Sequence, residues 1–466
     1  MQIKVKNTHN KFSLQSFFKN PARVIVVSFA VIILMGTFLL MLPISSREQI
    51  PTSFQNAFFT ATSATCVTGL VVVDTYQYFS LFGQVVILLL IQMGGLGLVT
   101  ITTFFNLAIR KRLRLKTMQI AQESINSDSM NDISSLIRMI IALTFSIEFC
   151  GALALSTVFI PKYGLDGIFI SVFLAISSYC NAGFDILGRE GAYVSLTHYA
   201  DNPVVLITIM CLIIFGGLGF VVWHDLYEYR FTKRIMLHTK IVLVATAVLI
   251  VFGGLMIMML EWSNPRTLGP MSVPEKLLNS MFLSVSCRTA GYNSFDLNGM
   301  NGITKLVCIA WMFIGAAPGS TGGGIKVTTF VVLFMTVVCT LSGKDDTIIW
   351  DRRVDKEAVY KALSVVVVAM IAVLGATCFI GLTIHSGGAM VSDINALFES
   401  TSAFATVGLS VGVTGVANPA SRMILAATMF LGRVGPVSLA LSMSWNSVNI
   451  RRQKHQIKPE GKILIG

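Results

Sequence analysis

The 466 residues are 54% hydrophobic and only 12% charged, which excludes an ordinary soluble domain and points to a polytopic membrane protein. The formal net charge of +12 does not indicate nucleic-acid binding, because the basic residues are interleaved with hydrophobic segments and form no continuous stripe with aromatic residues. We therefore expect the lipid bilayer, and no nucleic acid, as a partner.

The apolar segments follow one pattern that is used four times. A long apolar segment opens each unit, and these segments are predicted at residues 23–42, 137–160, 240–260 and 360–384. A half-length segment comes next, at 51–64, 167–178, 274–286 and 393–403. Segments of this length cannot cross about 30 Å of hydrocarbon as helices, so they must enter the membrane and turn back. A second long segment closes each unit, at 79–109, 203–227, 303–341 and 422–445.

This pattern predicts an all-α polytopic membrane protein with four repeats. The boundaries are 1–22 for an N-terminal segment, 23–114 for repeat 1, 115–136 for a linker, 137–234 for repeat 2, 235–343 for repeat 3, 344–450 for repeat 4 and 451–466 for a tail. Most of the 35 Lys and Arg residues fall on the side that holds both termini, which predicts cytoplasmic termini and half-length segments that enter from outside. Acidic residues outnumber basic ones in the outer loops, and a negative mouth enriches cations.

A glycine follows each half-length segment, at intervals of roughly 110 residues, longer than any solenoid repeat. The glycines are Gly69, Gly183, Gly291 and Gly408, with Phe59, Phe173, Met281 and Phe398 ten residues upstream. Non-helical backbone at membrane depth must be buried in protein or line water, and four re-entrant loops around one axis meet this condition together. We therefore predict helix–pore loop–helix repeats in a pseudo-fourfold arrangement around a single pore.

Carbonyl oxygens freed by such loops can replace the hydration shell of a cation. None of the residues before the glycines supplies a carboxylate, which favours a weakly hydrated monovalent cation over a divalent one. The residues predicted to form this selectivity filter are Val67, Thr68, Gly69, Asn181, Ala182, Gly183, Thr289, Ala290, Gly291, Thr406, Val407 and Gly408.

The closing segments carry a second glycine repeat, at 93–97, 215–219, 314–317 and 431–435. We expect close helix contacts at the first two copies. The third copy runs into GAAPGSTGGGIK (315–326), where Pro318 and the glycines must break the helix. It is not a phosphate-binding loop, because Ile325 separates the last glycine from the lysine and no strand precedes it.

We predict that 315–326 forms an intramembrane plug below the filter. Its residues are Gly315, Gly319, Ser320, Thr321, Gly322, Gly323, Gly324 and Lys326. Arg433, predicted at membrane depth in repeat 4, needs a partner and is expected to donate hydrogen bonds to the carbonyls of this loop. Arg288 is expected to pair with an outer carboxylate such as Asp296, and Glu148 to be paired inside the bundle rather than to carry protons.

Six strings in this order carry a family resemblance: FTATSATCVTGL (59–70), NAGF (181–184), RTAGYNSFD (288–296), GSTGGGIK (319–326), FESTSAFATVGL (398–409) and FLGRVGP (430–436). They resemble the membrane subunit of Ktr potassium-uptake systems, of the KtrB or KtrD type, which belongs with Trk and HKT proteins to one superfamily. The resemblance covers the chain from about residue 21 to its end. Three positions depart from the family pattern: Cys66 where Thr is usual, Cys180 where Asn is usual and Cys287 where Pro is usual.

The resemblance implies K+ bound at the predicted filter residues, gating by 315–326 with Arg433, and uptake that depends on Na+. It also implies a homodimer and a cytosolic nucleotide-binding regulatory ring of the KtrA or KtrC type, with no cofactor on this chain. The cysteine departures put pore polarity and sodium coupling in question.

The function predicted from these observations is potassium uptake across the plasma membrane. An intramembrane enzyme is disfavoured, because the histidines form no HExxH pair and no GxSxG surrounds Ser320. An alternating-access symporter remains the alternative, but such carriers are built from two inverted repeats, whereas all four units here start on the same side.

Overall fold

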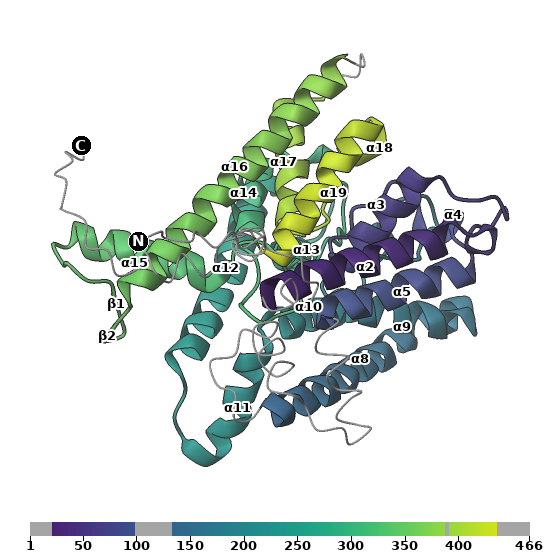
Figure 1. The fold of residues 1–466 in the computed structure, drawn as a ribbon. Helices are drawn as coiled ribbons and strands as arrows, with labels where there is room; N and C mark the ends of the chain where they lie inside the picture. The colour runs from purple at the N-terminus through teal and green to yellow at the C-terminus, as the bar shows by residue number, and fades with distance from the viewer. Residues whose placement is uncertain (1–20, 98–132, 387–390, 436–466) are drawn as a thin grey trace, which may run out of the picture.

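The computed structural model describes residues 21–97, 133–386 and 391–435, which are mostly α-helical (Figure 1). Four helices in this part of the chain are long and apolar enough to cross a membrane. They are α2 (Pro21–Met41), α8 (Ile133–Tyr163), α12 (Leu237–Glu261) and α16 (Lys356–Ser386). These are the four predicted opening segments, and the predicted all-α membrane fold is confirmed.

The half-length segments are helices within a few residues of the predicted bounds. They are α3 (Phe54–Thr65), α9 (Asp166–Tyr179), α13 (Val273–Ser286) and α17 (Asp393–Phe404). Local sequence sets three of the starts, since Ser53 and Ser392 cap α3 and α17 and a Ser272–Glu275 capping box begins α13.

The closing segments break more often than predicted. The helices are α5 (Leu81–Leu96), α10 (Pro203–Gly217), α11 (Phe220–Thr232), α14 (Gly302–Phe313), α15 (Val327–Leu341) and α19 (Pro419–Val434). The prediction of one continuous segment over 203–227 was wrong, because α10 and α11 meet at an angle of 89°. Gly219, with φ of 91°, stands at this break, and Gly97 and Gly435, with φ of 78° and 87°, follow the last residues of α5 and α19. The predicted continuations at 98–109 and 436–445 lie outside the described residues.

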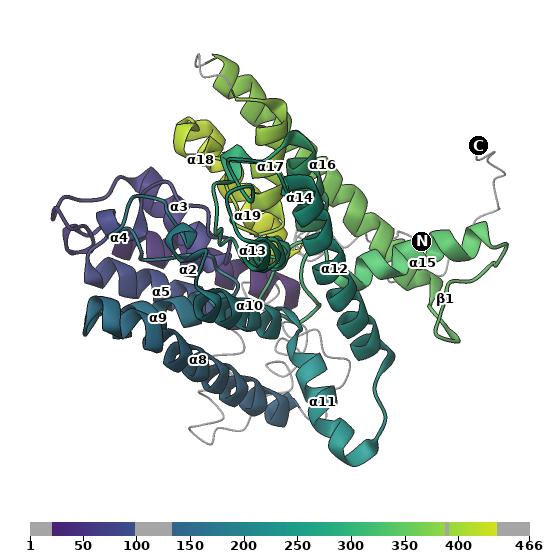
Figure 2. The same cartoon turned by 180° about the vertical axis from the view of Figure 1, so that it is seen from behind.

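Short elements complete the described chain. The loops on either side of the half-length helices hold η1 (Pro43–Ser45), α4 (Thr75–Tyr78), η2 (Thr197–Tyr199), η3 (Leu297–Gly299) and α18 (Val413–Val416). Between α15 and α16, β1 (Ile348–Ile349) and β2 (Arg352–Arg353) form an antiparallel hairpin. Both views place α15 and this hairpin to one side of the remaining helices (Figures 1 and 2).

The four repeats pack in a closed cycle. Each opening helix lies against the half-length helix of its own repeat, in the pairs α2 with α3, α8 with α9, α12 with α13 and α16 with α17. Each half-length helix also contacts the closing helix of the preceding repeat, in the pairs α3 with α19, α9 with α5, α13 with α10 and α17 with α14. The contact between repeats 4 and 1 is of the same kind as the contacts between successive repeats. The four repeats therefore close into the predicted pseudo-fourfold arrangement.

A fully buried phenylalanine anchors each half-length helix in the core. Phe59, Phe173 and Phe398 occupy the predicted positions. In repeat 3 the buried residue is Phe282 rather than the predicted Met281. Repeat 3 therefore has one residue fewer between its anchor and its glycine, and α13 ends five residues before Gly291, whereas α3 ends four residues before Gly69.

Candidate functional site

The segments that follow the half-length helices share one backbone conformation. Two residues before each glycine, φ is positive: 58° at Val67, 59° at Asn181, 67° at Thr289 and 51° at Thr406. The glycines also have positive φ, between 69° and 91°, while the residues between them do not. A β-branched residue in the left-handed region is strained, and strain of this kind collects at functional sites. Positive φ recurs at this position in all four repeats, and three of the four residues are β-branched, which indicates that the fold requires this conformation.

The four glycines form a closed ring, which we call the glycine ring. A β-carbon added to Gly69 would lie 2.5 Å from the Ala182 carbonyl oxygen, and one added to Gly183 would lie 2.5 Å from that of Ala290. The same relation joins Gly291 to Val407 and Gly408 back to Thr68. The carbonyls of Thr68, Ala182, Ala290 and Val407 therefore each lie against the next quarter of the ring. Only glycine allows this close approach.

Serine side chains tie the ring to the half-length helices. The hydroxyls of Ser63 and Ser402 accept hydrogen bonds from the Gly69 and Gly408 amides, at 3.1 and 3.0 Å. Ser177 donates to the Phe184 carbonyl at 2.7 Å, and Ser286 donates to that of Tyr292. The sequence prediction missed these serines. Their signal was present, since each stands four residues after the buried phenylalanine of its helix.

A cavity of about 350 Å³ opens on one side of the glycine ring. All four glycines line it, together with the carboxylates of Asp74, Asp185 and Asp296. These acids come from the loops that follow the ring in repeats 1, 2 and 3. The cavity therefore combines the four ring glycines with negative charge at its wall, an arrangement that attracts cations.

On the other side, polar side chains of the ring segments meet the glycine-rich loop, residues 315–326. The Asn181 amide group lies 3.1 Å from Thr289 Oγ1 and 3.2 Å from Thr321 Oγ1. Thr321 Oγ1 also donates to the Tyr179 carbonyl at 3.1 Å, and the Gly323 amide donates to Thr406 Oγ1 at 3.0 Å. The loop thus lies directly against three quarters of the ring.

The glycine-rich loop occupies the break between α10 and α11. The Ala317 amide donates to the Gly217 carbonyl at 3.0 Å, and the Phe220 amide donates to the Gly319 carbonyl at 2.8 Å. The backbone groups freed by the break are therefore satisfied by the loop of another repeat, as membrane depth requires. Lys326 Nζ donates to the Gly322 carbonyl at 2.6 Å and holds the loop across its own turn.

Arg433, near the end of α19, connects the glycine-rich loop to α5. Its guanidinium donates to the Thr321 carbonyl and to the carbonyls of Gly94 and Gly95, the last at 3.2 Å. The predicted hydrogen bond from Arg433 to the loop is present. The contacts to α5 were not predicted, and they make Arg433 a bridge between repeats 4, 3 and 1.

The closing-helix glycines allow the close helix contacts that their sequence predicts. A β-carbon on Gly94, Gly216 or Gly432 would collide with the carbonyl at the end of a half-length helix. These carbonyls belong to Thr65, Tyr179 and Phe404. Such contacts bring α5, α10 and α19 directly against the segments that carry the glycine ring.

Of the two other buried ionisable residues considered in the sequence, one has a partner of the predicted kind and one does not. Glu148 is paired as predicted, accepting from Gln92 Nε2 at 3.1 Å, with Cys180 Sγ 4.0 Å from its carboxylate. The predicted pairing of Arg288 with Asp296 was wrong, since no ion pair among the described residues includes Arg288. The three unusual cysteines, Cys66, Cys180 and Cys287, are buried behind the ring.

Comparison with known proteins places this geometry in a family. Residues 2–450 match the family described as TrkH, cation transport protein. The chain is similar to Ktr system potassium uptake protein B of Bacillus subtilis, with 38% identity over 448 residues, 96% of this chain and 97% of that protein. It is also similar to potassium/sodium uptake protein NtpJ of Enterococcus hirae, with 35% identity over 453 residues, 96% of this chain and 97% of that protein.

A solved structure has the same fold. The crystal structure of the potassium transporter TrkH from Vibrio parahaemolyticus superposes with a TM-score of 0.71 at 15% identity, covering 94% of this chain and 86% of that one. Its fold, the four spanning helices and the family match agree. This chain is a multi-pass membrane protein that belongs to the TrkH family of cation transport proteins.

Proposed function

We propose that this chain carries potassium ions into the cell through the glycine ring. The observation that supports this most directly is the positive φ repeated in four quarters, together with the carbonyls held against each neighbouring glycine. Rings of backbone carbonyls are the means by which potassium pathways replace the ion's hydration shell. The filter residues proposed are the twelve predicted from sequence, three from each repeat, and K+ is the transported ion rather than a resident cofactor.

The glycine-rich loop is the proposed gate. It lies against Asn181, Thr289 and Thr406, directly on one side of the ring, and Arg433 holds it to α5. Ions that leave the ring on this side must pass the loop. Opening therefore requires the hydrogen bonds of Thr321, Lys326 and Arg433 to rearrange, which gives a regulator a small number of contacts to change.

The names of two relatives support the proposed partners and sodium dependence. Their names describe a Ktr system and potassium/sodium uptake, which supports a regulatory partner and a role for Na+. We include in the proposal a homodimer, a cytosolic nucleotide-binding regulatory ring, a plasma-membrane location and cytoplasmic termini. The last of these places the 350 Å³ cavity, with its acids, at the outer mouth.

The proposal is tested by complementation and by flux. The chain is expressed with a regulatory ring in a potassium-uptake-deficient host, and we expect growth on low potassium. In proteoliposomes we expect rubidium influx that rises when sodium is added. Absence of both rescue and rubidium flux, with the protein present in the membrane, would overturn the proposed function. Flux that ignores sodium would overturn only the sodium dependence.

A further inference from the structure

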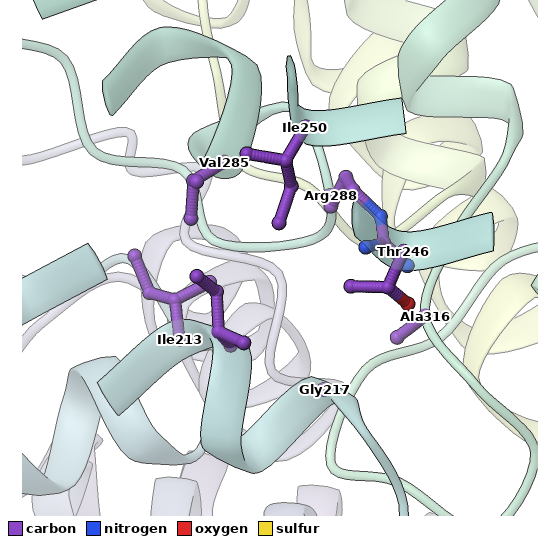
Figure 3. Close-up of a pocket in the computed structure, with 8 residues that line it drawn as sticks. Ile213, Gly217, Thr246, Ile250, Val285, Arg288 and Ala316 are labelled. Carbon is purple, nitrogen blue, oxygen red and sulfur yellow. The ribbon is translucent and has the colours of Figure 1, made fainter. Parts of the chain in front are cut away.

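A small cavity lies behind the third quarter of the glycine ring, and Arg288 reaches into it (Figure 3). Its volume is about 10 Å³, and a cavity of that size holds about one water molecule. Ile213, Ile250 and Val285 supply apolar walls, while Gly217 and Ala316 supply backbone from the α10–α11 break and the glycine-rich loop. Arg288 is 6% exposed.

Two polar atoms of the side chains that line this space have no hydrogen-bond partner among the residues that the structure describes. They are Arg288 Nε and Thr246 Oγ1, both buried. Figure 3 shows the two side chains next to one another at the cavity wall. One water molecule in the cavity would satisfy both atoms, but a water does not neutralise the guanidinium. Burying a charge without a counter-ion is costly, so a residue retained in this state calls for an explanation.

The charge lies close to the ring and in one repeat only. Arg288 directly precedes Thr289, and its carbonyl lies 3.5 Å from the side-chain amide group of Asn181. The residues three positions before the other ring glycines are Cys66, Cys180 and Ala405, which carry no positive charge. Arg433, a partly buried arginine that also lies near the ring, differs because its guanidinium donates three hydrogen bonds to carbonyls.

We propose that Arg288 is a positioning residue that sets how tightly the ring holds its cation. Its uncompensated positive charge lowers the affinity of the ring for K+ and so speeds release toward the glycine-rich loop. A unit charge about 10 Å from an ion, at an effective dielectric constant of about 20, changes binding roughly tenfold. Conduction requires that the ion is bound weakly enough to leave, and a positive charge near the ring weakens its binding in this way. This inference rests on the proposed function.

The first test removes the charge. In proteoliposomes that contain the chain with its regulatory ring, we expect Arg288→Met to lower the KM for rubidium about tenfold and to lower the maximal rate as well. Arg288→Lys keeps the charge, and we expect it to retain the KM of the unchanged protein. An unaltered KM in Arg288→Met, or the same fall in Arg288→Lys, would overturn the inference.

A second test neutralises the charge in place, in case Arg288→Met fails to fold. Thr246→Asp sets a carboxylate of similar size beside the guanidinium, and Thr246→Asn is its uncharged match. We expect Thr246→Asp to lower the KM as Arg288→Met does, and Thr246→Asn to leave it unchanged. Equal KM values for these two variants would overturn the inference while leaving the proposed function intact. Absence of rubidium flux in the unchanged protein would instead overturn the proposed function.

Discussion

The glycine ring and the glycine-rich loop both depend on glycine, but all four repeats contribute equally to the ring and only one repeat forms the loop. Each repeat contributes one quarter of the ring, in the same backbone conformation and with the same contact to its neighbour. The loop comes from repeat 3 alone, yet its backbone bonds to α10 of repeat 2 and α19 of repeat 4. Ion recognition is thus proposed where the repeats remain equivalent, and control where one repeat departs from the others.

The largest expected effect comes from breaking the ring. In Gly183→Ala the new β-carbon would lie 2.5 Å from the Ala290 carbonyl oxygen, at a φ of 69°. Strain and a backbone clash of a few kcal/mol correspond to a loss of roughly a hundredfold or more. We expect rubidium flux to fall by that factor.

The matched control for this variant is Gly375→Ala in α16, where an added β-carbon meets nothing within 4 Å. It should leave flux unchanged. Normal flux through Gly183→Ala, at equal amounts of protein in the membrane, would show that the ring does not carry the ion.

The next effect comes from releasing the loop. Arg433→Ala removes the bridge from the loop to α5, and charged hydrogen bonds contribute about 1.5–3 kcal/mol each. We expect flux to rise, by roughly tenfold where part of that energy favours the closed state. Deleting residues from the segment 319–323 should also raise rubidium flux.

Arg422→Ala is the control for Arg433, because the guanidinium of Arg422 donates to the Gly415 carbonyl in α18 instead of to the loop. It should not raise flux. Unchanged flux in both Arg433→Ala and the shortened loop, with normal expression, would contradict the gating role of the loop.

A smaller rise is expected from Thr321→Val. The side chain keeps its volume but loses the hydroxyl that donates to the Tyr179 carbonyl, a bond contributing about 1 kcal/mol. Flux of rubidium should rise about fivefold. Thr340→Val, where the lost hydroxyl bonds only within α15, should behave like the unchanged protein. A fall in flux in Thr321→Val would mean that this hydroxyl assists conduction instead of closure.

The smallest effect is a pH dependence at the 350 Å³ cavity, which we propose to be the outer mouth. Burial, with the nearby Asp74 carboxylate, raises the pKa of Asp185 to about 6. Asp185 is therefore charged above pH 6 and gains a proton below it, which removes negative charge from the cavity wall. We expect the KM for rubidium to rise a few-fold as the outer pH falls from 7 to 5.

Asp185→Asn should remove that pH dependence and hold the KM at its acidic value. Asp201→Asn, an outer acid that does not line the cavity, should keep it. Because a bound cation favours the ionised carboxylate, raising potassium should move the midpoint to lower pH. An identical pH profile in Asp185→Asn would contradict this assignment.

Much of the fold could be predicted from the sequence because its signals are local. The length of each apolar segment separates spanning helices from half-length ones, and Ser53, Ser272 and Ser392 mark helix starts. The glycines of the ring are visible as a repeat. Even the bond from Arg433 to the loop could be predicted, since a buried arginine in a membrane protein needs acceptors and the loop has free carbonyls.

Other features depended on partners that are distant in sequence. The glycines at 215–219 would suit close packing of a continuous helix as well as a break in it. The local sequence therefore does not show that the helix breaks here. It breaks because the Phe220 amide finds an acceptor at Gly319, in another repeat. Likewise Asp296 was a plausible partner for Arg288 by spacing, but the side chain reaches the cavity at Thr246 instead.

The sequence by itself determined which segments cross the membrane, which turn back and where glycine recurs, because hydrophobic length and backbone freedom are properties of single segments. Only the tertiary structure decided that the four quarters close into a ring, that the loop of repeat 3 fills the break in repeat 2, and that Arg288 has no counter-ion within residues 21–97, 133–386 and 391–435. Each of these depends on which donor meets which acceptor across repeats, and that pairing exists only once all four repeats are packed together.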